Sequence, residues 1–315
     1  MPISIIQPTN AAPASIFDQS TLLGRTNPSL LEQSVPASTT RQDAVGQRRT
    51  TQNGVDVTLP RTASGEFRLS SGDRSVALRV GHHGDAITAP DNTVRYDPGD
   101  DYFTTAIPKT DGSLQLVTTV ENANAPQFFS YDLRLPSGSQ ISKSEKGGLV
   151  FTSPAGKYLG EVLPPWANDA TGRPLETSYE VQGNRLIQRV LHSKSGAVYP
   201  VIADPWFGID LYRTPWVSSA SAGYKINVQP TLWGTQAASI ATWWAHRDEV
   251  VSKLGGNAYL WTNSIQEQFY CHIAGLPLSI RGDGTYNMES WRPVMNWAEQ
   301  APWNCNYPEG GYGSL

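Results

Sequence analysis

The chain has 315 residues, of which 17% are charged, and its formal net charge is −4. Because it carries no sustained basic field, we expect neither nucleic acid nor an anionic membrane surface as its partner. No run approaches the roughly 18 uninterrupted apolar residues of a membrane-spanning helix, so no transmembrane segment is expected.

Residues 1–54 are rich in Pro, Ser, Thr, Ala, Asn and Gln, and Phe17 is their only aromatic residue. Such a composition buries too little apolar surface to offset the entropy lost on ordering, so it predicts a disordered leader. The first residues lack the basic and hydrophobic regions of a signal peptide. Export therefore has to be inferred from other parts of the chain.

Residues 55–204 consist of short alternating runs separated by Gly, Pro, Asn and Asp, for example SVALRV, SLQLVTTVE and FFSYDLRLP. Each run predicts a strand with one face to bury. Turns such as those at Pro136 and Thr110 favour antiparallel neighbours, and no convincing helix interrupts the series. We expect a β-rich domain that forms an antiparallel sandwich or meander.

The composition changes after Pro205, because nine of the ten tryptophans lie between Trp206 and Trp303. This indicates a second, Trp-rich domain over residues 205–315. The segment AGYKINVQPTLWG is typical of a strand. Residues 235–254 predict one long amphipathic helix with Thr235 as its N-cap and Gly255 as its stop.

A second helix is expected from Ser264, because SIQE matches the capping box in which Glu267 reaches back to the cap amide. The segment GTYNMESWRP is strand-like, and a short helical turn is expected around residues 294–300. This order of strand, helix, helix and strand predicts a small α+β domain.

Cys271 and Cys305 are the only cysteines, and they have neither zinc-type spacing nor a CxxC redox motif. One disulfide is the simplest interpretation, with two reduced, buried thiols as the alternative. On the chain-entropy model a loop of this size would stabilise the fold by about 3–4 kcal/mol. Such a bond persists only in an oxidising compartment.

Several motifs in this domain occur together and in order: HRDEVVSK, EQFYCHIAG at residues 267–275, YNMESWRP at residues 286–293, and CNYPEGG from Cys305. Residues 207–313 resemble the actinobacterial domain-of-unknown-function family 2599, which has similar segments. Tyr286 and Met288 stand where the family pattern has Trp and Leu, and Tyr307 is inserted before the Pro. The resemblance implies the domain but no activity.

Residues 110–206 resemble the β-rich leader that many secreted actinobacterial proteins carry ahead of varied C-terminal domains. This resemblance implies export and an extracellular location. It also implies that the signal peptide not seen in this chain reflects a start site or a boundary of the sequence.

His272 is the main candidate for chemistry, because a histidine titrates near neutral pH and can act as acid, base or ligand. Glu267, five residues earlier on the predicted helix, cannot pair with it there. Ile265 and Phe269 share its face. A hydrogen-bonded, half-buried structural histidine is therefore the alternative interpretation.

Glu289, Trp291 and Arg292 form a second candidate set, because a Trp plane between a carboxylate and a guanidinium could bind a sugar or a peptide carboxylate. The alternative is an ion pair packed on a core tryptophan. Trp243 and Trp244 join the binding candidates, since Trp lines glycan-binding surfaces as well as filling small cores.

Three histidines, His82, His83 and His246, are expected to have no chemical role. His246 with Arg247 is interpreted as part of a solvated helix face. His82 and His83 lack a set of acidic or cysteine ligands at metal spacing, so no metal site is expected. No P-loop, dinucleotide or hydrolase motif occurs, and we expect no cofactor.

Two hypotheses of function follow. The first is a secreted, non-catalytic interaction module whose Trp-rich domain meets a cell-wall glycan, lipid or protein partner. The second is a small secreted hydrolase or toxin-like effector with His272 as general base and Glu289 or Asp283 beside it. The position of His272 separates them: open to a cleft near a carboxylate, or sealed against Phe269 and Ile265.

Overall fold

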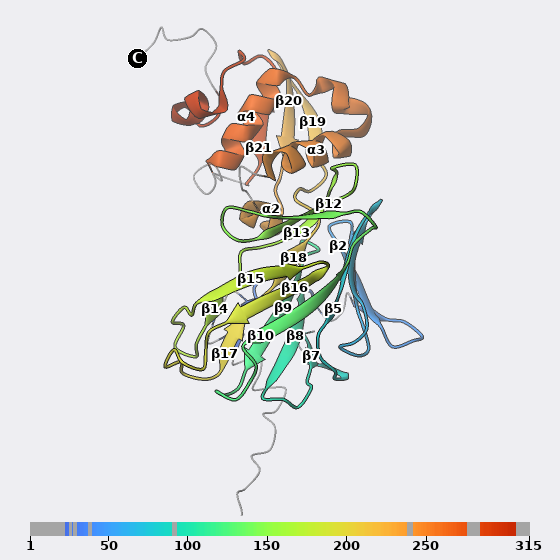
Figure 1. Ribbon diagram of the computed structural model, residues 1–315. Coiled ribbons are helices and arrows are strands. Elements are labelled where there is room, and N and C mark those ends of the chain that lie inside the picture. The colour runs from blue at the N-terminus through green and yellow to red at the C-terminus, as the bar shows by residue number, and fades with distance from the viewer. Residues whose placement is uncertain are drawn as a thin grey trace, which may run out of the picture.

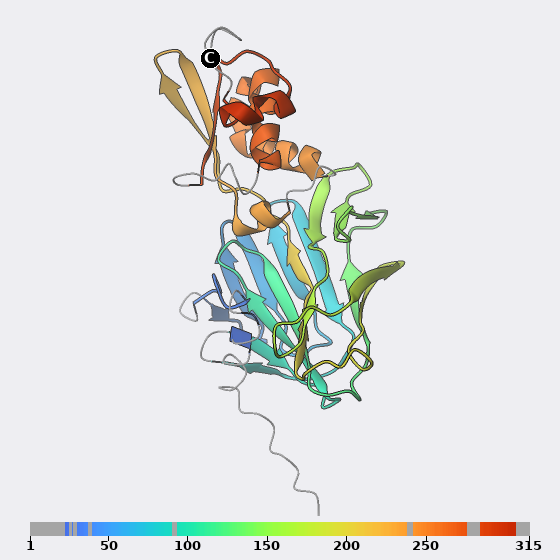
Figure 2. The same cartoon turned by 90° about the vertical axis from the view of Figure 1, so that its left-hand side faces the viewer.

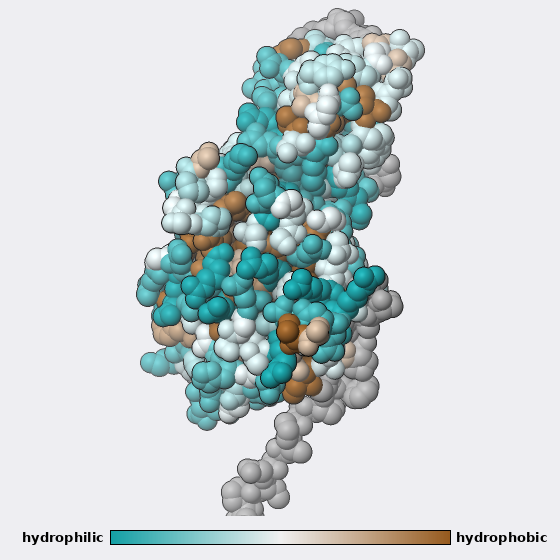
Figure 3. Space-filling model, turned by 90° about the vertical axis from the view of Figure 1, so that its right-hand side faces the viewer, coloured by the Kyte–Doolittle hydropathy of each residue, from teal (hydrophilic) through white to brown (hydrophobic). Residues whose placement is uncertain are grey.

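The computed structural model describes residues 23–24, 27, 30–36, 40–89, 93–237, 242–275 and 284–306. A large β sandwich and a smaller domain, in which helices pack on one side of a three-stranded sheet, lie one above the other (Figure 1). Among these residues no helix is long and apolar enough to cross a membrane. The face seen in Figure 3 is mainly hydrophilic, with hydrophobic side chains in small patches.

The sandwich consists of two antiparallel sheets. The first contains, in spatial order, β1 (Arg41–Gln42), β2 (Arg48–Gln52), β3 (Val55–Leu59), β4 (Phe67–Ser71), β5 (Arg74–Val80), β10 (Phe128–Arg134), β16 (Arg185–Val190) and β15 (Thr177–Gln182). The second contains β11 (Gln140–Lys143), β12 (Leu149–Thr152), β13 (Tyr158–Val162), β18 (Trp206–Gly208), β9 (Leu114–Val120), β8 (Tyr102–Pro108), β7 (Val94–Tyr96) and β6 (Ala86–Thr88). Beside β9 lies β17 (Val201–Ala203), which also pairs with β14 (Ala167–Asn168).

Strand alternation builds the core of the sandwich. In β10 the side chains of Phe129, Tyr131 and Leu133 are buried, while Phe128 and Arg134 are exposed. The inward-facing residues of both sheets form one continuous hydrophobic cluster. The expected β-rich middle domain is therefore confirmed, and its form is a sandwich.

Part of the predicted disordered leader, residues 1–54, forms strands in the structure. Residues 48–52 form β2, which pairs with β3 along its whole length. Further upstream, Leu30 and Val35 are buried, and Leu30 packs against Val117 on the outward face of β9. Composition predicted this segment wrongly because β2, which lies between β1 and β3, is held mainly by backbone hydrogen bonds and needs few apolar side chains. Residues 1–22 lie outside the described part of the chain.

The C-terminal domain is α+β, as expected. Its sheet has the order β19 (Trp216–Ala220), β20 (Gly223–Val228) and β21 (Tyr286–Glu289). Its helices are α2 (Leu232–Gln236), α3 (Trp243–Leu254), the 3₁₀ helix η4 (Gly255–Leu260), α4 (Asn263–Ala274) and the 3₁₀ helix η5 (Trp297–Trp303). In Figure 2 the β19–β20 hairpin lies on one side of the domain and the helices lie on the other.

Both helix starts differ from the sequence prediction. Thr231, not Thr235, caps α2, since its hydroxyl accepts a hydrogen bond from the Gly234 amide, and α3 starts only at Trp243. Gly255 does end α3, as predicted. Thr262 caps α4 through the Ile265 amide. The long helix and the capping box were wrong because residues 230–262 offer several competing caps, and tertiary contacts select among them.

The two residues of the predicted capping box have tertiary partners instead. The Ser264 hydroxyl donates to the carbonyl oxygen of Arg292 at 2.7 Å. The Glu267 carboxylate accepts a hydrogen bond from the Trp297 amide at 2.8 Å. These bonds fasten α4 to the segment that leads into η5, so the side chains stabilise the tertiary fold of the domain.

A close backbone approach joins the two domains. A Cβ atom on Gly208 of β18 would lie 2.2 Å from the Trp233 ring of α2, so only glycine fits there. The Trp233 amide donates to the Asp111 carboxylate of the sandwich at 2.7 Å, and the Trp206 and Trp233 rings meet edge to face. Helix α2 is thereby anchored to the sandwich.

Candidate functional site

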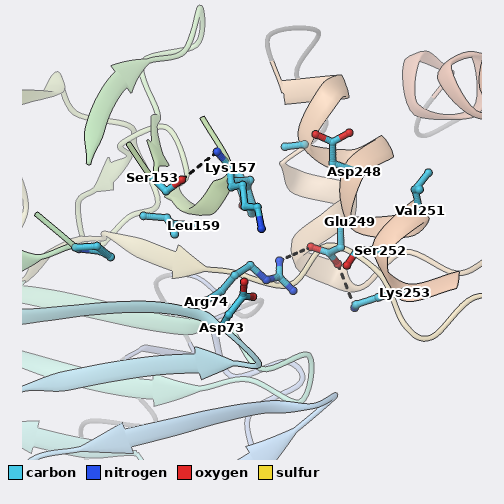
Figure 4. A pocket seen from close by; sticks show the side chains of 13 residues that line it. Asp73, Arg74, Ser153, Lys157, Leu159, Asp248, Glu249, Val251, Ser252 and Lys253 are labelled. Carbon is cyan, nitrogen blue, oxygen red and sulfur yellow. Dashed lines mark hydrogen bonds and ion pairs between the residues drawn. The ribbon is translucent and has the colours of Figure 1, made fainter. Parts of the chain in front are cut away.

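A groove of about 550 Å³ lies between the sandwich and α3 (Figure 4). The sandwich side contributes Asp73, Arg74, Pro136, Ser153, Lys157, Tyr158 and Leu159. Helix α3 contributes Ala245, Asp248, Glu249, Val251, Ser252 and Lys253. A volume of this size suits a small molecule or a short peptide segment.

Four charged side chains close a ring beside the groove. The Arg74 guanidinium lies 2.6 Å from the Glu249 carboxylate and 2.9 Å from the Asp210 carboxylate. The Lys253 ammonium lies 3.1 Å from Glu249 and 2.9 Å from Asp210. Two cations and two carboxylates alternate, so the ring is neutral overall although its carboxylates are almost fully buried.

The ring also holds the backbone that connects the two domains. The Glu249 carboxylate accepts hydrogen bonds from the Leu211 amide at 2.8 Å and the Tyr212 amide at 2.9 Å. The Arg74 guanidinium donates to the Ile209 carbonyl oxygen at 2.6 Å, and the Lys253 ammonium donates to that of Tyr212. Glu249, Arg74 and Lys253 are thus each satisfied by both ions and peptide groups, and the Asp210 carboxylate accepts a further hydrogen bond from the Asn53 side-chain amide at 2.8 Å, as buried ion pairs require.

Burial and the neighbouring cations have opposite effects on the pKa values of the two carboxylates in this ring. Burial raises the pKa of Asp210 to about 6, and repulsion from Glu249 adds to the rise, while Lys253 and Arg74 oppose it. Burial also disfavours the Glu249 carboxylate, but attraction by Lys253 and Arg74 outweighs it and lowers the pKa of Glu249. Glu249 is therefore the fixed anion on which the interface is built.

Lys157 is the cation of the groove that has no partner among the described residues. It is exposed, precedes β13 and forms no ion pair with any of them. Its side chain points into the groove (Figure 4). Leu159 and Val251 supply apolar walls, and Asp73 adds a carboxylate. The groove therefore combines apolar contact with one available ammonium group.

A buried acid lies behind the groove wall. The Tyr158 hydroxyl donates to the Glu161 carboxyl at 3.2 Å, and Glu161 is 5% exposed. Burial raises the pKa of Glu161 to about 8, although the Tyr158 hydrogen bond lowers it. Glu161 is thus largely neutral at pH 7 and adds no negative charge near Lys157.

The disulfide joins α4 to the residue that follows η5. Cys271 and Cys305 are bonded, with their Cα atoms 5.4 Å apart, so the predicted pairing is confirmed. The bond closes the chain around β21, which lies between the two cysteines in the sequence. It therefore ties the last described segment to the helical layer.

Residues 211–308 match the family model described as protein of unknown function (DUF2599). We refer to the matched region as the DUF2599 domain. The match begins two residues after Ile209, just beyond the last sandwich strand, and it agrees with the resemblance predicted from the motifs. No curated protein matches the chain.

His272 is sealed inside the DUF2599 domain. It is 6% exposed, and its ring stacks on that of Tyr286 with centroids 4.9 Å apart and planes at 4°. Burial lowers the pKa of His272 to about 4, so the ring is neutral at pH 7. It does not line the interdomain groove. This is the sealed position that favours a structural histidine.

Glu289 lies on the other side of the sheet from His272. Successive residues of β21 face opposite sides, so Tyr286 and Met288 face the helices while Glu289 faces away from them. The Glu289 carboxylate is 2.9 Å from the Lys225 ammonium and 2.5 Å from the Arg292 guanidinium. His272 and Glu289, predicted as a catalytic pair, are therefore not brought together, and the other predicted partner, Asp283, lies outside the described residues.

Trp291 has cations near its ring in the DUF2599 domain. The Lys225 ammonium lies 5.5 Å from the ring centroid and the Arg292 guanidinium 5.8 Å. Glu289 binds both cations, so the predicted set of Glu289, Trp291 and Arg292 does assemble, with its charges already paired.

The tryptophan pair of α3 packs inward. Trp243 is 8% exposed, stacks on Tyr270 at 5.3 Å and meets Trp297 edge to face at 4.9 Å. Trp244 is half-buried and packs against the same cluster. Trp243 therefore offers little ring surface to a ligand.

The prediction that His246 lies on a solvated helix face was wrong. His246 is fully buried, and its Nδ1 is 2.7 Å from the Tyr212 hydroxyl. Burial lowers its pKa to about 4. Trp243, His246 and Val250 follow helical spacing and form the buried face of α3. The prediction missed this face because it treated His246 as a polar residue.

The ring residues were missed at the sequence level. Glu249 and Lys253 are four apart in HRDEVVSK, which is a recognisable helical ion-pair spacing. Arg74 and Asp210 gave no such signal, because 136 residues separate them along the chain. Only the packing of the domains places these residues together.

Proposed function

We propose that this protein is an exported, non-catalytic interaction module of the cell envelope or extracellular space. The sandwich holds the DUF2599 domain in one orientation, and the groove between them receives a peptide segment of the partner. The observation that carries the proposal is the closed ring of Arg74, Asp210, Glu249 and Lys253 beside a groove in which the Lys157 ammonium forms no ion pair with any described residue.

The disulfide supports export. A bond between Cys271 and Cys305 persists in an oxidising environment, as outside the cell, and is rare in the reducing cytosol. It also clamps a small domain that has a limited core of its own. The resemblance of residues 110–206 to leaders of secreted proteins points to the same location.

The charge ring supports a binding role. Because its four charges neutralise one another and hold the connecting backbone, the two walls of the groove keep a fixed spacing. A rigid, preformed groove loses little entropy when a ligand enters. The charges of the ring residues are already paired with one another and with the connecting backbone. Recognition of a ligand is therefore assigned to the side chains around Lys157.

The lining of the groove indicates the chemistry of the partner. Leu159, Val251 and Ala245 provide apolar contact, and the Lys157 ammonium provides an attraction for a carboxylate. Peptide segments offer this combination when an apolar side chain lies next to an acidic residue or a free C-terminus. We therefore infer a polypeptide partner.

The test uses the full-length protein on an array of defined ten-residue peptides, followed by calorimetric titration of the strongest binders. We expect binders to combine apolar residues with a carboxylate. Lys157→Glu should weaken binding at least tenfold, whereas Lys146→Glu, which changes an exposed lysine of the preceding turn, should leave it within twofold. An array without binders, or binders indifferent to Lys157→Glu, would refute the groove as a peptide site.

A further inference from the structure

The outward face of the eight-stranded sheet carries a set of exposed arginines. Because side chains alternate along a strand, the residues on this face are those between the buried positions of β2, β4, β5, β10 and β16. The exposed arginines are Arg49, Arg68, Arg79, Arg134, Arg185 and Arg189.

Three of these arginines stand in one cross-strand row. Arg49 of β2 pairs with Thr58, which pairs with Arg68 of β4. Arg68 pairs with Ala77 of β5, which pairs with Arg134 of β10. An arginine therefore recurs on every second strand, at intervals of about 9–10 Å. The strand register of the sheet sets this spacing.

The row lies along a continuous trough. One hollow of about 530 Å³ is lined by Arg49, Thr58 and Arg68 among others. A second of about 300 Å³ lies between Arg68 and Arg134, and a third of about 370 Å³ between Arg134 and Arg185. Because neighbouring hollows share Arg68 and Arg134, they form one path across the strands, roughly 24 Å long from β2 to β16.

The arginines along the trough differ in whether they are already ion-paired or can bind a ligand anion directly. Arg49 pairs with Asp43 at 3.4 Å, Arg68 pairs with Glu66, and Arg185 pairs with Asp132 at 2.7 Å. These pairs are exposed and weakly held, so a ligand anion can replace a partner. Arg134, at the centre, forms no ion pair with a described residue.

We propose that this trough binds an acidic polysaccharide, a chain in which carboxylates alternate with neutral sugar hydroxyls. Arginine binds carboxylates through two parallel hydrogen bonds, and its regular spacing fits a repeated anion. Between the arginines lie amides and hydroxyls that suit sugar hydroxyl groups, namely Gln47, Ser70, Ser75, Gln182 and Asn184.

The interspersed carboxylates argue for this ligand over a nucleic acid. Asp56 and Glu66 line the first hollow and Asp132 the third. A phosphate backbone carries a negative charge at every nucleotide and would meet these carboxylates, whereas a polysaccharide can place a neutral unit there. The Arg74 and Arg79 side chains point to opposite faces of β5, so the trough and the interdomain groove open on different sides of this strand, although Pro136 lines both.

The experiment titrates the full-length protein with hyaluronate, in which a uronate alternates with a neutral sugar, at low and moderate salt, with neutral dextran and a single-stranded oligonucleotide as comparisons. We expect saturable binding of hyaluronate that weakens as salt rises, no binding of dextran and much weaker binding of the oligonucleotide. Arg134→Ala should weaken hyaluronate binding at least tenfold. The matched control Arg213→Ala, an exposed arginine of the DUF2599 domain, should stay within twofold.

Absence of hyaluronate binding, equal binding of the oligonucleotide, or unchanged affinity in an Arg68→Ala/Arg134→Ala double variant with native circular dichroism would overturn the proposal. Lys157→Glu should leave polysaccharide binding unchanged. Failure of this inference is therefore distinguishable from failure of the peptide groove.

Discussion

The guanidinium of Arg74 and the carboxylate of Glu249 lie 2.6 Å apart across the boundary between the sandwich and the DUF2599 domain. Arg74 belongs to β5 and Glu249 to α3, and both are largely buried. The relative position of the two domains therefore depends on a contact that neither domain could make alone.

Removing one member of this pair should destabilise the protein strongly. Arg74→Ala leaves two buried carboxylates with a single cation, which typically costs about 3–5 kcal/mol. Urea denaturation followed by circular dichroism measures the loss. Arg79→Ala, on the exposed side of the same strand, should change stability by no more than about 0.5 kcal/mol. Equal stability of the two variants would show that the ring does not hold the domains.

The protein should lose stability between pH 6.5 and 8. Burial raises the pKa of Glu161 to about 8, and burial likewise raises that of Asp204 to about 8. Both are ionised in the unfolded chain above about pH 4.5. The unfolded state thus binds fewer protons than the folded state, and stability falls as pH rises through this window.

Below pH 6.5 the two histidines offset this trend. His246 and His272 have pKa values lowered to about 4 by burial, so the unfolded chain binds more protons than the fold as pH drops. Urea midpoints at pH 6.5 and 8 provide the measurement. The double variant Glu161→Gln/Asp204→Asn should flatten the difference, and a midpoint that rises toward pH 8 would contradict the assignment.

Substitution of His272 distinguishes packing from chemistry. His272→Ala removes the ring stacked on Tyr286 and should lower stability by about 1–3 kcal/mol, while His272→Phe keeps a stacked ring and should lose less. Thermal melts of both variants test this. A His272→Gln variant that kept its melting temperature but lost a hydrolytic activity of the native protein would instead assign the histidine to catalysis.

The contact between Gly208 and Trp233 should tolerate no added methyl group. In Gly208→Ala the new Cβ would overlap the indole, which overpacks the domain boundary and should cost about 1–3 kcal/mol or more. Gly256→Ala is the matched control, because nothing lies within 4 Å of its Cβ position. Chemical denaturation followed by tryptophan fluorescence compares them, and a native-like Gly208→Ala variant would rule out the close approach.

Local patterns in the sequence were sufficient for the elements that depend on near neighbours. Alternation along FFSYDLRLP predicted β10, because period two is a property of the strand itself. The motifs from Glu267 to Cys305 predicted the DUF2599 family, and the two cysteines predicted their own bond. Gly255 was recognised as a helix stop for the same local reason.

Tertiary structure alone decided the features that join distant residues. Residues 48–52 form a strand despite their polar side chains, because their backbone forms hydrogen bonds with β3. His246 can lie in the core because the Tyr212 hydroxyl forms a hydrogen bond with its Nδ1. Arg74 and Glu249 are 175 residues apart in the sequence and form an ion pair only because the two domains pack together. The energy of a buried charge is set by its surroundings in the fold and not by its sequence neighbours.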